Sequence, residues 1–258
     1  MEIQRESIFI SSIRSLFKTF CGVIGFFLAF LPVIIIMTAM GVKQDHLQKN
    51  KLTILPDHNG EAKMLPLKTP AILQINIKGV IGVDKGVITK TIEDQLLESR
   101  TGLLKDNRVK GILLYVNTPG GSVFDSDDIY RLIKSYKKKY KLPVYTYVNG
   151  LCASGGMYIA CSSDKIYASP VSVIGSVGVI NGPFFNVYDF LKKNNVLTKT
   201  ITQGKGKDAM SMFKPWAENE DDAIRPITEF FYHRFLNIVS TNRKIDKEIA
   251  YKLLAHLE

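Results

Sequence analysis

An α/β fold with a mostly parallel sheet is the fold class that the sequence predicts. Between about residues 71 and 160, apolar runs of strand length alternate with segments of helical periodicity. The run GILLYV, from Gly111 to Val116, is apolar throughout, which is typical of a parallel strand covered on both faces. The length of 258 residues, with 46% hydrophobic and 22% charged residues, suits one sizeable globular domain with appendages.

The first element expected is a transmembrane helix. The stretch from Thr19 to Val42 holds 24 consecutive residues without a charge, and about 20 apolar residues cross a bilayer. A cleaved signal peptide is the alternative, but its apolar region has only roughly 7–15 residues and ends at a small-residue cleavage site, which we do not find here. We therefore expect an uncleaved anchor. Basic residues flank both ends of this stretch almost equally, so the charge distribution gives little information on its orientation in the membrane. The short N-terminal tail, residues 1–18, favours a cytoplasmic N-terminus.

A polar linker and a folded domain follow the anchor. Residues 43–69 contain Pro56, Gly60 and Pro66 and are assigned to the linker, and residues 70–258 to the domain. Within the domain we expect strands at 71–77, 111–116, 144–148, 165–168 and 197–202. Helices are expected at 87–104, 126–140, 185–191, 219–241 and 246–257. A glycine-interrupted apolar stretch, 173–180, would line a groove or form a bulge.

Two glycine-rich loops follow consecutive predicted strands. One runs from Thr118 to Ser122 and contains Pro119-Gly120-Gly121, and the other runs from Asn149 to Gly156. Strand, helix, strand, helix order implies right-handed crossovers, so both loops are expected at the same edge of the sheet. Their backbone N–H groups would then form a two-donor oxyanion hole. The alternative for the first loop is an ordinary tight turn.

Ser154 lies at the centre of the second loop, in the segment NGLCASGGMYI. A strand leads into this segment and a helix leads out, which places Ser154 near a helix N-terminus, where negative charge on a bound carbonyl oxygen is stabilised. A nucleophile is one interpretation, and a simple helix N-cap is the other. The G-x-S-x-G sequence of an α/β-hydrolase elbow is absent around Ser154.

A serine nucleophile needs a base. The four histidines lie in the predicted linker and the terminal helices, not at the presumed site edge. A neutral lysine can replace histidine, at a cost of roughly 4–5 kcal/mol for lowering a lysine pKa from about 10.4 to 7. Lys207, in a glycine-rich loop after a predicted strand, is the best placed candidate, and Lys205 is its rival. An ordinary surface lysine is the alternative interpretation.

Five motifs together carry a resemblance to a known family. In order they are TPGG from Thr118, CASGGMYIA from Cys152, DKIYASP from Asp164, GSVGV from Gly175 and GKGKD from Gly204. Their order and spacing resemble the signal peptide peptidase A family of serine proteases. Three departures stand out. Thr118 replaces the usual serine, Cys152 occupies a position that is often smaller, and the sequence stops at Glu258, before the strand and helix with which members usually end; a short or truncated form is therefore expected.

The resemblance implies a Clp-protease/crotonase-like spiral of ββα units with an N-terminal membrane anchor. It assigns Ser154 as nucleophile, Lys207 as general base, and the backbone amide of Gly121, with that of Ser154 or Gly155, as oxyanion donors. It implies a homo-oligomer whose active sites are shared between subunits, hydrophobic peptides as substrates, and no metal or other cofactor. The expected location is the inner (cytoplasmic) membrane, with one span and the protease domain outside the cytoplasm.

Two other functions remain open at this point. One is a non-catalytic membrane scaffold of the same fold, and the other is a crotonase-type acyl-CoA enzyme. The formal charge of +10 includes a lysine-rich run between Lys134 and Lys141, which is either a solvated helix face or a contact for anionic lipid headgroups. Aromatic and basic residues are not interleaved, so nucleic acid is not expected as a partner. Three cysteines argue against a disulfide framework.

Overall fold

A computed structural model describes residues 8–41, 52–56, 59–61, 66, 69–101, 104–246 and 248–249. The chain divides into two compact units, Met1–Lys51 and Leu52–Glu258. The first unit contains helix α1 (Ile8–Gly41), which includes most of the predicted span. Within the described part of the chain, no helix meets the combined length and hydropathy criteria for crossing a membrane.

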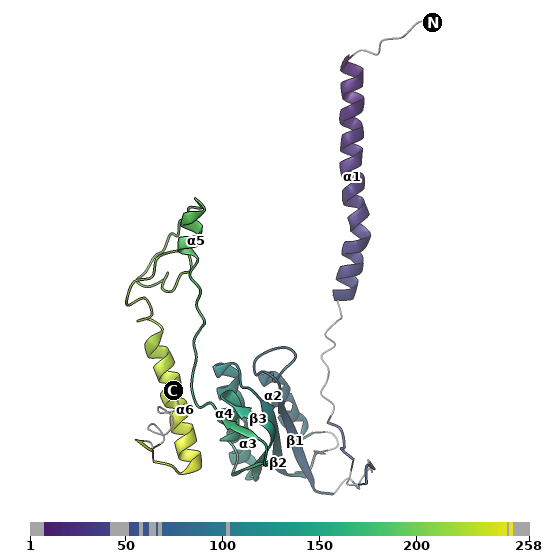
Figure 1. The fold of residues 1–258 in the computed structure, drawn as a ribbon. Helices are drawn as coiled ribbons and strands as arrows, with labels where there is room; N and C mark the ends of the chain where they lie inside the picture. The colour runs from purple at the N-terminus through teal and green to yellow at the C-terminus, as the bar shows by residue number, and fades with distance from the viewer. Residues whose placement is uncertain are drawn as a thin grey trace. The chain divides into compact units, whose positions relative to one another are not determined.

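A parallel sheet forms the centre of the second unit (Figure 1). Four strands lie side by side in chain order, and they are β1 (Ala71–Lys78), β2 (Val109–Thr118), β3 (Val144–Ala153) and β4 (Lys165–Ala168). The fifth, β5 (Val173–Gly175), pairs with the last three residues of β3. Every pair is parallel. The predicted α/β class with a parallel sheet is therefore confirmed.

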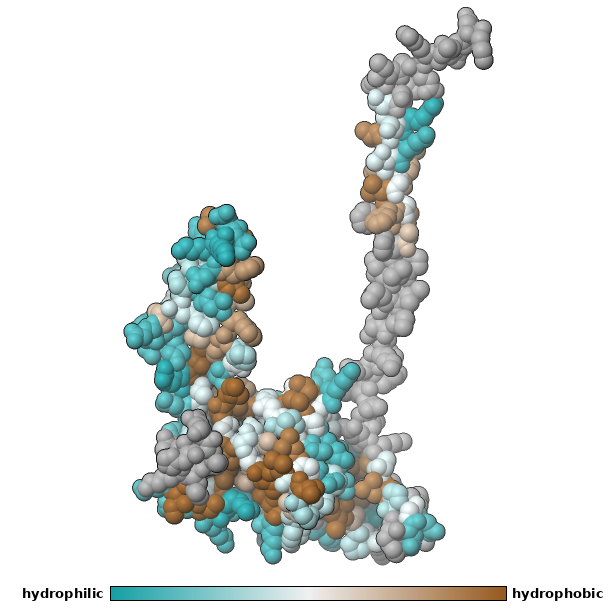
Figure 2. Space-filling model, in the orientation of Figure 1, coloured by the Kyte–Doolittle hydropathy of each residue, from teal (hydrophilic) through white to brown (hydrophobic). Residues whose placement is uncertain are grey.

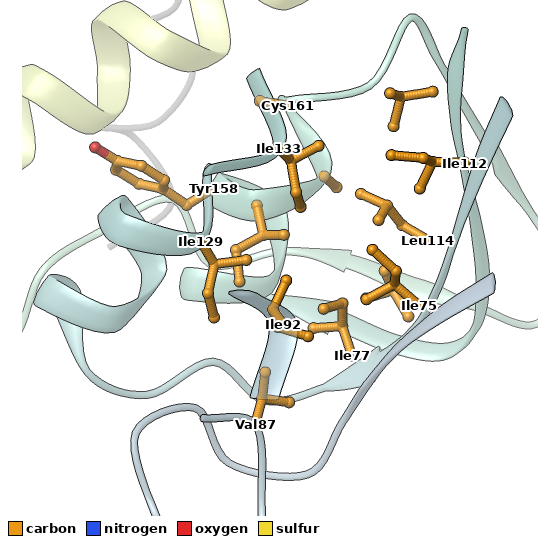
Figure 3. Close-up of a cluster of buried hydrophobic side chains, with 14 of the residues drawn as sticks. Ile75, Ile77, Val87, Ile92, Ile112, Leu114, Ile129, Ile133, Tyr158 and Cys161 are labelled. Carbon is orange, nitrogen blue, oxygen red and sulfur yellow. The ribbon is translucent and has the colours of Figure 1, made fainter. Parts of the chain in front are cut away.

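Helices α2 (Thr89–Glu98), α3 (Val123–Tyr140) and α4 (Gly155–Ala160) connect these strands. Their apolar side chains and those of the strands form one hydrophobic cluster, in which Ile75, Leu114 and Ile129 are fully buried (Figure 3). The opposite face of the sheet is more open, because Tyr145 and Tyr167 are 41% and 52% exposed. The expectation that the 111–116 strand is covered on both faces is therefore wrong in part. Its residues alternate, with Tyr115 only half-buried and its ring centroid 5.8 Å from that of Tyr147.

An extended segment follows β5 and leads away from the sheet to α5 (Tyr188–Lys193), as Figure 1 shows. We call residues 176–224 the arm. Its own hydrogen bonds hold it together, including one from the N–H of Val187 to the carbonyl of Met212 at 2.9 Å. None of the α5 residues is buried. The chain then returns as α6 (Arg225–Arg243), which packs against α4.

Further sequence-based expectations need correction in this unit. The helix predicted at 87–104 spans only Thr89–Glu98, and the one predicted at 185–191 spans Tyr188–Lys193. The strand predicted at 197–202 is wrong, because the segment has no strand partner and leaves Leu197 97% and Ile201 86% exposed. Strand β3 extends beyond the predicted 144–148, because its second half finds partners in β5 and in Thr118 of β2. The helix predicted from residue 219 begins at Arg225. Most of the helix predicted at 246–257 lies outside the described residues.

Candidate active site

Ser154 is the single residue between the end of β3 and the start of α4. Its φ of 50° and ψ of −119° are rare for a residue with a side chain, and such conformations cost about 1–3 kcal/mol. Its backbone N–H donates to the carbonyl of Gly175 at 3.1 Å, and its carbonyl accepts from the N–H of Tyr158 at 3.0 Å. Hydrogen bonds on both sides therefore hold the strained turn in place.

The Ser154 side chain makes no capping hydrogen bond, although the residue occupies the N-cap position. The simple N-cap interpretation is therefore wrong. A sharp, strained turn from strand to helix is the geometry of a nucleophile elbow. The usual sequence motif is missing because Cys152 stands where the motif has its first glycine, whereas Gly156 matches the second. The backbone thus reaches this geometry without the sequence signal that normally reveals it.

The two glycine-rich loops meet at Gly120. A Cβ on Gly120 would lie 2.8 Å from Cβ of Ser154 and 2.8 Å from N of Gly155. Gly120 also has a φ of 97°, which side chains rarely adopt. Only glycine therefore allows this approach. The prediction that the two loops lie at one edge of the sheet is confirmed.

Peptide geometry sets the direction of the Gly121 N–H. The carbonyl of Gly120 accepts a hydrogen bond from the N–H of Ile81 at 2.9 Å. Because the C=O and N–H of a trans peptide point in opposite directions, the N–H of Gly121 points away from Ile81. Within the described residues, no hydrogen bond engages the N–H of Gly121 or of Gly155. Neither N–H group therefore has a partner among the described residues, and Gly121 is exposed whereas Gly155 is buried.

The side chain of Thr118, which is buried, holds the loop that contains Gly120 and Gly121 in place through two hydrogen bonds. Its Oγ1 donates to the carbonyl of Gly79 at 2.5 Å and accepts from the N–H of Gly120 at 3.0 Å. Its methyl group fills the space beside Gly156, where an added Cβ would come within 2.5 Å. Thr118 therefore holds the first loop through its hydroxyl and packs against the second loop through its methyl group.

Lys207 and Lys205 both lie on the arm and are exposed. No hydrogen bond or ion pair joins either lysine to Ser154 in the described part of the chain. Figure 1 shows the arm extending away from the sheet edge that carries α4. Within a single chain, the structure does not bring the predicted base to the predicted nucleophile.

A charged cluster that the sequence reasoning missed lies beside Lys207. Nζ of Lys214 is 3.0 Å from Oδ2 of Asp208 and 2.9 Å from Oε1 of Glu220. Hydrogen bonds to Glu220 and Asp208 raise the pKa of Lys214, so this lysine is not a candidate base. Glu220 also accepts from the N–H of Met210 at 2.9 Å, which fixes the loop that follows Lys207. No local sequence pattern marks this cluster, because its members come from three separate turns.

Comparisons with known proteins show sequence similarity to a peptidase family. The model of peptidase family S49 matches residues 136–256, and that of the NfeD1b N-terminal domain matches residues 81–185. A protein of Enterococcus faecium, provisionally named signal peptide peptidase SppA, is 34% identical over 187 residues, which are 70% of this chain and 54% of the relative. Protease 4 of Haemophilus influenzae is 31% identical over 202 residues, which are 78% of this chain and 32% of the relative.

The similarity covers only part of the length of each relative. The chain spans about half the length of the first curated relatives, 54% and 48%. Among solved structures, a ClpP1 mutant from Listeria monocytogenes has a TM-score of 0.43 at 16% identity, covering 69% of this chain and 77% of that one. The resemblance first drawn from five short motifs is confirmed by the family match and by these relatives.

Proposed function

We propose that this relative of the S49 peptidases is a membrane-anchored serine endopeptidase, with Ser154 as nucleophile and Lys207 as general base. The observation that carries the proposal is the strained turn at Ser154, in contact with Gly120 of the neighbouring loop. A serine without a capping role, next to two unengaged backbone donors, is the arrangement that acyl transfer requires.

The proposed chemistry assigns each of these groups one role. Oγ of Ser154 attacks the scissile carbonyl carbon while its proton passes to the neutral amine of Lys207. The N–H groups of Gly121 and Gly155 stabilise the negative charge that develops on the carbonyl oxygen. The protonated lysine then gives its proton to the leaving amine, which releases one peptide and leaves an acyl-enzyme. Water activated by the same lysine hydrolyses the ester.

A second copy of the chain is needed to complete this site. A lysine acts as a base only where burial disfavours its ammonium form, and Lys207 is exposed in the single chain. The arm that carries it exposes large apolar side chains, among them Phe185 at 70% and Leu197 at 97% (Figure 2). Patches of this kind mark contact surfaces. We infer a homo-oligomer in which the arm of one subunit brings Lys207 to Ser154 of its neighbour.

Hydrophobic peptides are the proposed substrates, including remnant signal peptides. The segment that begins with β5 is hydrogen-bonded to Ser154 through Gly175, and it exposes Val173 at 65% and Ile180 at 86%. An extended peptide laid along this segment would find apolar contacts next to the nucleophile.

The membrane anchor is proposed from the sequence, because the stretch Thr19–Val42, most of which lies in α1, carries no charge. We place the chain in the cytoplasmic membrane, with one span and with the second unit outside the cytoplasm. This arrangement would hold the active site close to peptides that remain in the bilayer after export.

The test is covalent labelling of the full-length chain in detergent with a fluorophosphonate, read by intact mass. We expect one label per active chain, lost in Ser154→Ala and in Lys207→Ala. Lys205→Ala is the matched control, because Lys205 is an exposed lysine of the same loop, and it should keep the label.

Other outcomes would replace the proposal. Labelling that survives Ser154→Ala would remove Ser154 as the nucleophile, and loss in Lys205→Ala alone would move the base to Lys205. A folded oligomer without any label would favour the non-catalytic scaffold. Binding of coenzyme A, measured by calorimetry, would favour the acyl-CoA enzyme.

A further inference from the structure

Three helices far apart in the sequence converge on one carboxylate. Oδ1 of Asp127, on α3, accepts hydrogen bonds from the hydroxyl of Tyr158 on α4 at 2.6 Å and from Nη2 of Arg234 on α6 at 2.7 Å. Nε of Arg234 is 3.0 Å from the same oxygen and 3.1 Å from the Tyr158 hydroxyl. Each member therefore contacts both others, which makes a closed triangle of hydrogen bonds.

The triangle is charge-assisted and only partly shielded from water, because the side chain of Asp127 is 19% exposed and that of Arg234 is 42% exposed. Burial by itself would raise the pKa of Asp127, but hydrogen bonds from Tyr158 and Arg234 and the charges of Arg234 and Arg131 outweigh it and keep the pKa below its ordinary 3.8. Burial, together with the Asp127 hydrogen bond, raises the pKa of Tyr158, so its hydroxyl remains a donor. Hydrogen bonds to ionised groups of this kind are about twice as strong as neutral ones.

Tyr158 links the triangle directly to the nucleophile. Its backbone N–H donates to the carbonyl of Ser154 at 3.0 Å, four residues earlier. Figure 3 shows its side chain at the border of the hydrophobic cluster, pointing toward α6. The ring packs against Phe235 of α6, with 5.0 Å between centroids, and against Tyr130 of α3, with 5.5 Å.

Helix α4 needs such external support. It has only six residues, and a helix this short has little stability of its own because nucleation is costly. The turn at Ser154 is also strained, so it persists only where neighbouring structure holds it. Tyr158 lies one helical turn after Ser154, and its contacts with α3 and α6 supply that support.

We propose that Arg234 is a positioning residue for Ser154, which acts through Asp127 and Tyr158 to fix the orientation of α4 against the glycine-rich loop. The inference rests on the proposed function, because it assigns a role in presenting the nucleophile. Under this proposal, helix α6 helps to hold the active site in place, although Arg234 lies 107 residues from Asp127 along the chain.

The experiment compares the rate of fluorophosphonate labelling in the full-length chain. Arg234→Gln and Tyr158→Phe should each slow labelling about tenfold, since small displacements of a reacting group carry large rate costs. Arg234→Lys keeps the charge and should recover part of the loss. The double variant should be no slower than the worse single variant, because both changes break one triangle.

Arg131→Gln is the matched control. Nε of Arg131 pairs with the other oxygen of Asp127 at 2.9 Å, and its side chain is 60% exposed. Its loss leaves the triangle with Tyr158 and Arg234 in place, so the labelling rate should change by less than about twofold.

Hydrogen exchange provides a readout independent of catalysis. Arg234→Gln should speed exchange in peptides that cover α4, with β2 as the unaffected reference. If wild type is not labelled yet α4 loses protection, the proposed function fails and the link from α6 to α4 stands. If wild type is labelled and Arg234→Gln changes neither the rate nor the exchange, the positioning role is wrong.

Discussion

Gly120 and Ser154 lie so close together that a methyl group on Gly120 would come within 2.8 Å of Cβ of Ser154. This contact joins the two loops that the sequence predicted at one edge of the sheet. We therefore expect Gly120→Ala to abolish fluorophosphonate labelling and to lower the free energy of unfolding by about 1–3 kcal/mol, from the clash and the φ of 97°. Gly111→Ala in β2, whose new Cβ would make only ordinary contacts at 3.5 Å with Pro143, is the control. Urea unfolding and intact mass measure both effects.

Thr118 offers a test of the hydroxyl that supports the glycine-rich loop. Thr118→Val keeps the shape but leaves the carbonyl of Gly79 and the N–H of Gly120 without their partner. It should cost about 1–3 kcal/mol of stability and slow labelling. Thr118→Ser keeps the hydroxyl and loses only a methyl group, so its labelling rate should stay close to wild type. Equal labelling rates in the two variants would show that the hydroxyl has no role in positioning the loop.

A shared active site predicts complementation between two inactive chains. Ser154→Ala and Lys207→Ala should each be unlabelled alone. When the two are dissociated and reassembled together, Ser154 of one chain should meet Lys207 of the other, and label should appear only on the Lys207→Ala chain. Intact mass distinguishes the two chains. A mixture that stays unlabelled while mixed oligomers form would show that nucleophile and base come from the same chain.

The contacts of the arm should govern that assembly. Leu197→Glu places a charge on a side chain that is 97% exposed in the single chain. Such a change at a solvated position alters stability by no more than about 0.5 kcal/mol, but it should dissociate an oligomer that buries the arm. Size-exclusion chromatography with light scattering measures the mass, and labelling should fall with it. Lys199→Glu, an exposed position of the same segment, is the control for the charge.

The Asp127 triangle predicts a defined pH dependence of stability. The folded pKa of Asp127 is lower than its ordinary value of 3.8. A carboxyl with a depressed folded pKa contributes stability above its unfolded pKa and loses it as the pH falls through the folded value. The wild type should thus be more stable than Asp127→Asn from neutral pH down to about pH 5, and the difference should shrink below pH 3.8. Urea unfolding over this range measures it, and a difference that grows toward acid pH would contradict the assignment.

Several features of the protein follow from local sequence. The alternation of apolar strands and periodic helices identified the parallel sheet, and β4 appears with the predicted bounds of Lys165–Ala168. The glycine pairs at Gly120 and Gly155 marked the two loops that meet, because right-handed crossovers place the loops after consecutive parallel strands at one edge. Five short motifs in order were enough to identify the related family.

Tertiary structure alone decided the remaining features. The conformation of Ser154 depends on its hydrogen bond to the carbonyl of Gly175 and on the one it accepts from the N–H of Tyr158, and no elbow motif in the sequence predicts it. The stretch at 197–202 consists mostly of apolar or β-branched residues, as a strand does, but it has no strand partner among the described residues, because a strand forms only where a partner supplies hydrogen bonds and burial. The contact between Asp127 and Arg234 spans 107 residues. Local patterns specify which residues are apolar and where the chain turns, whereas long-range contacts depend on how the elements pack, and packing is a property of the whole fold.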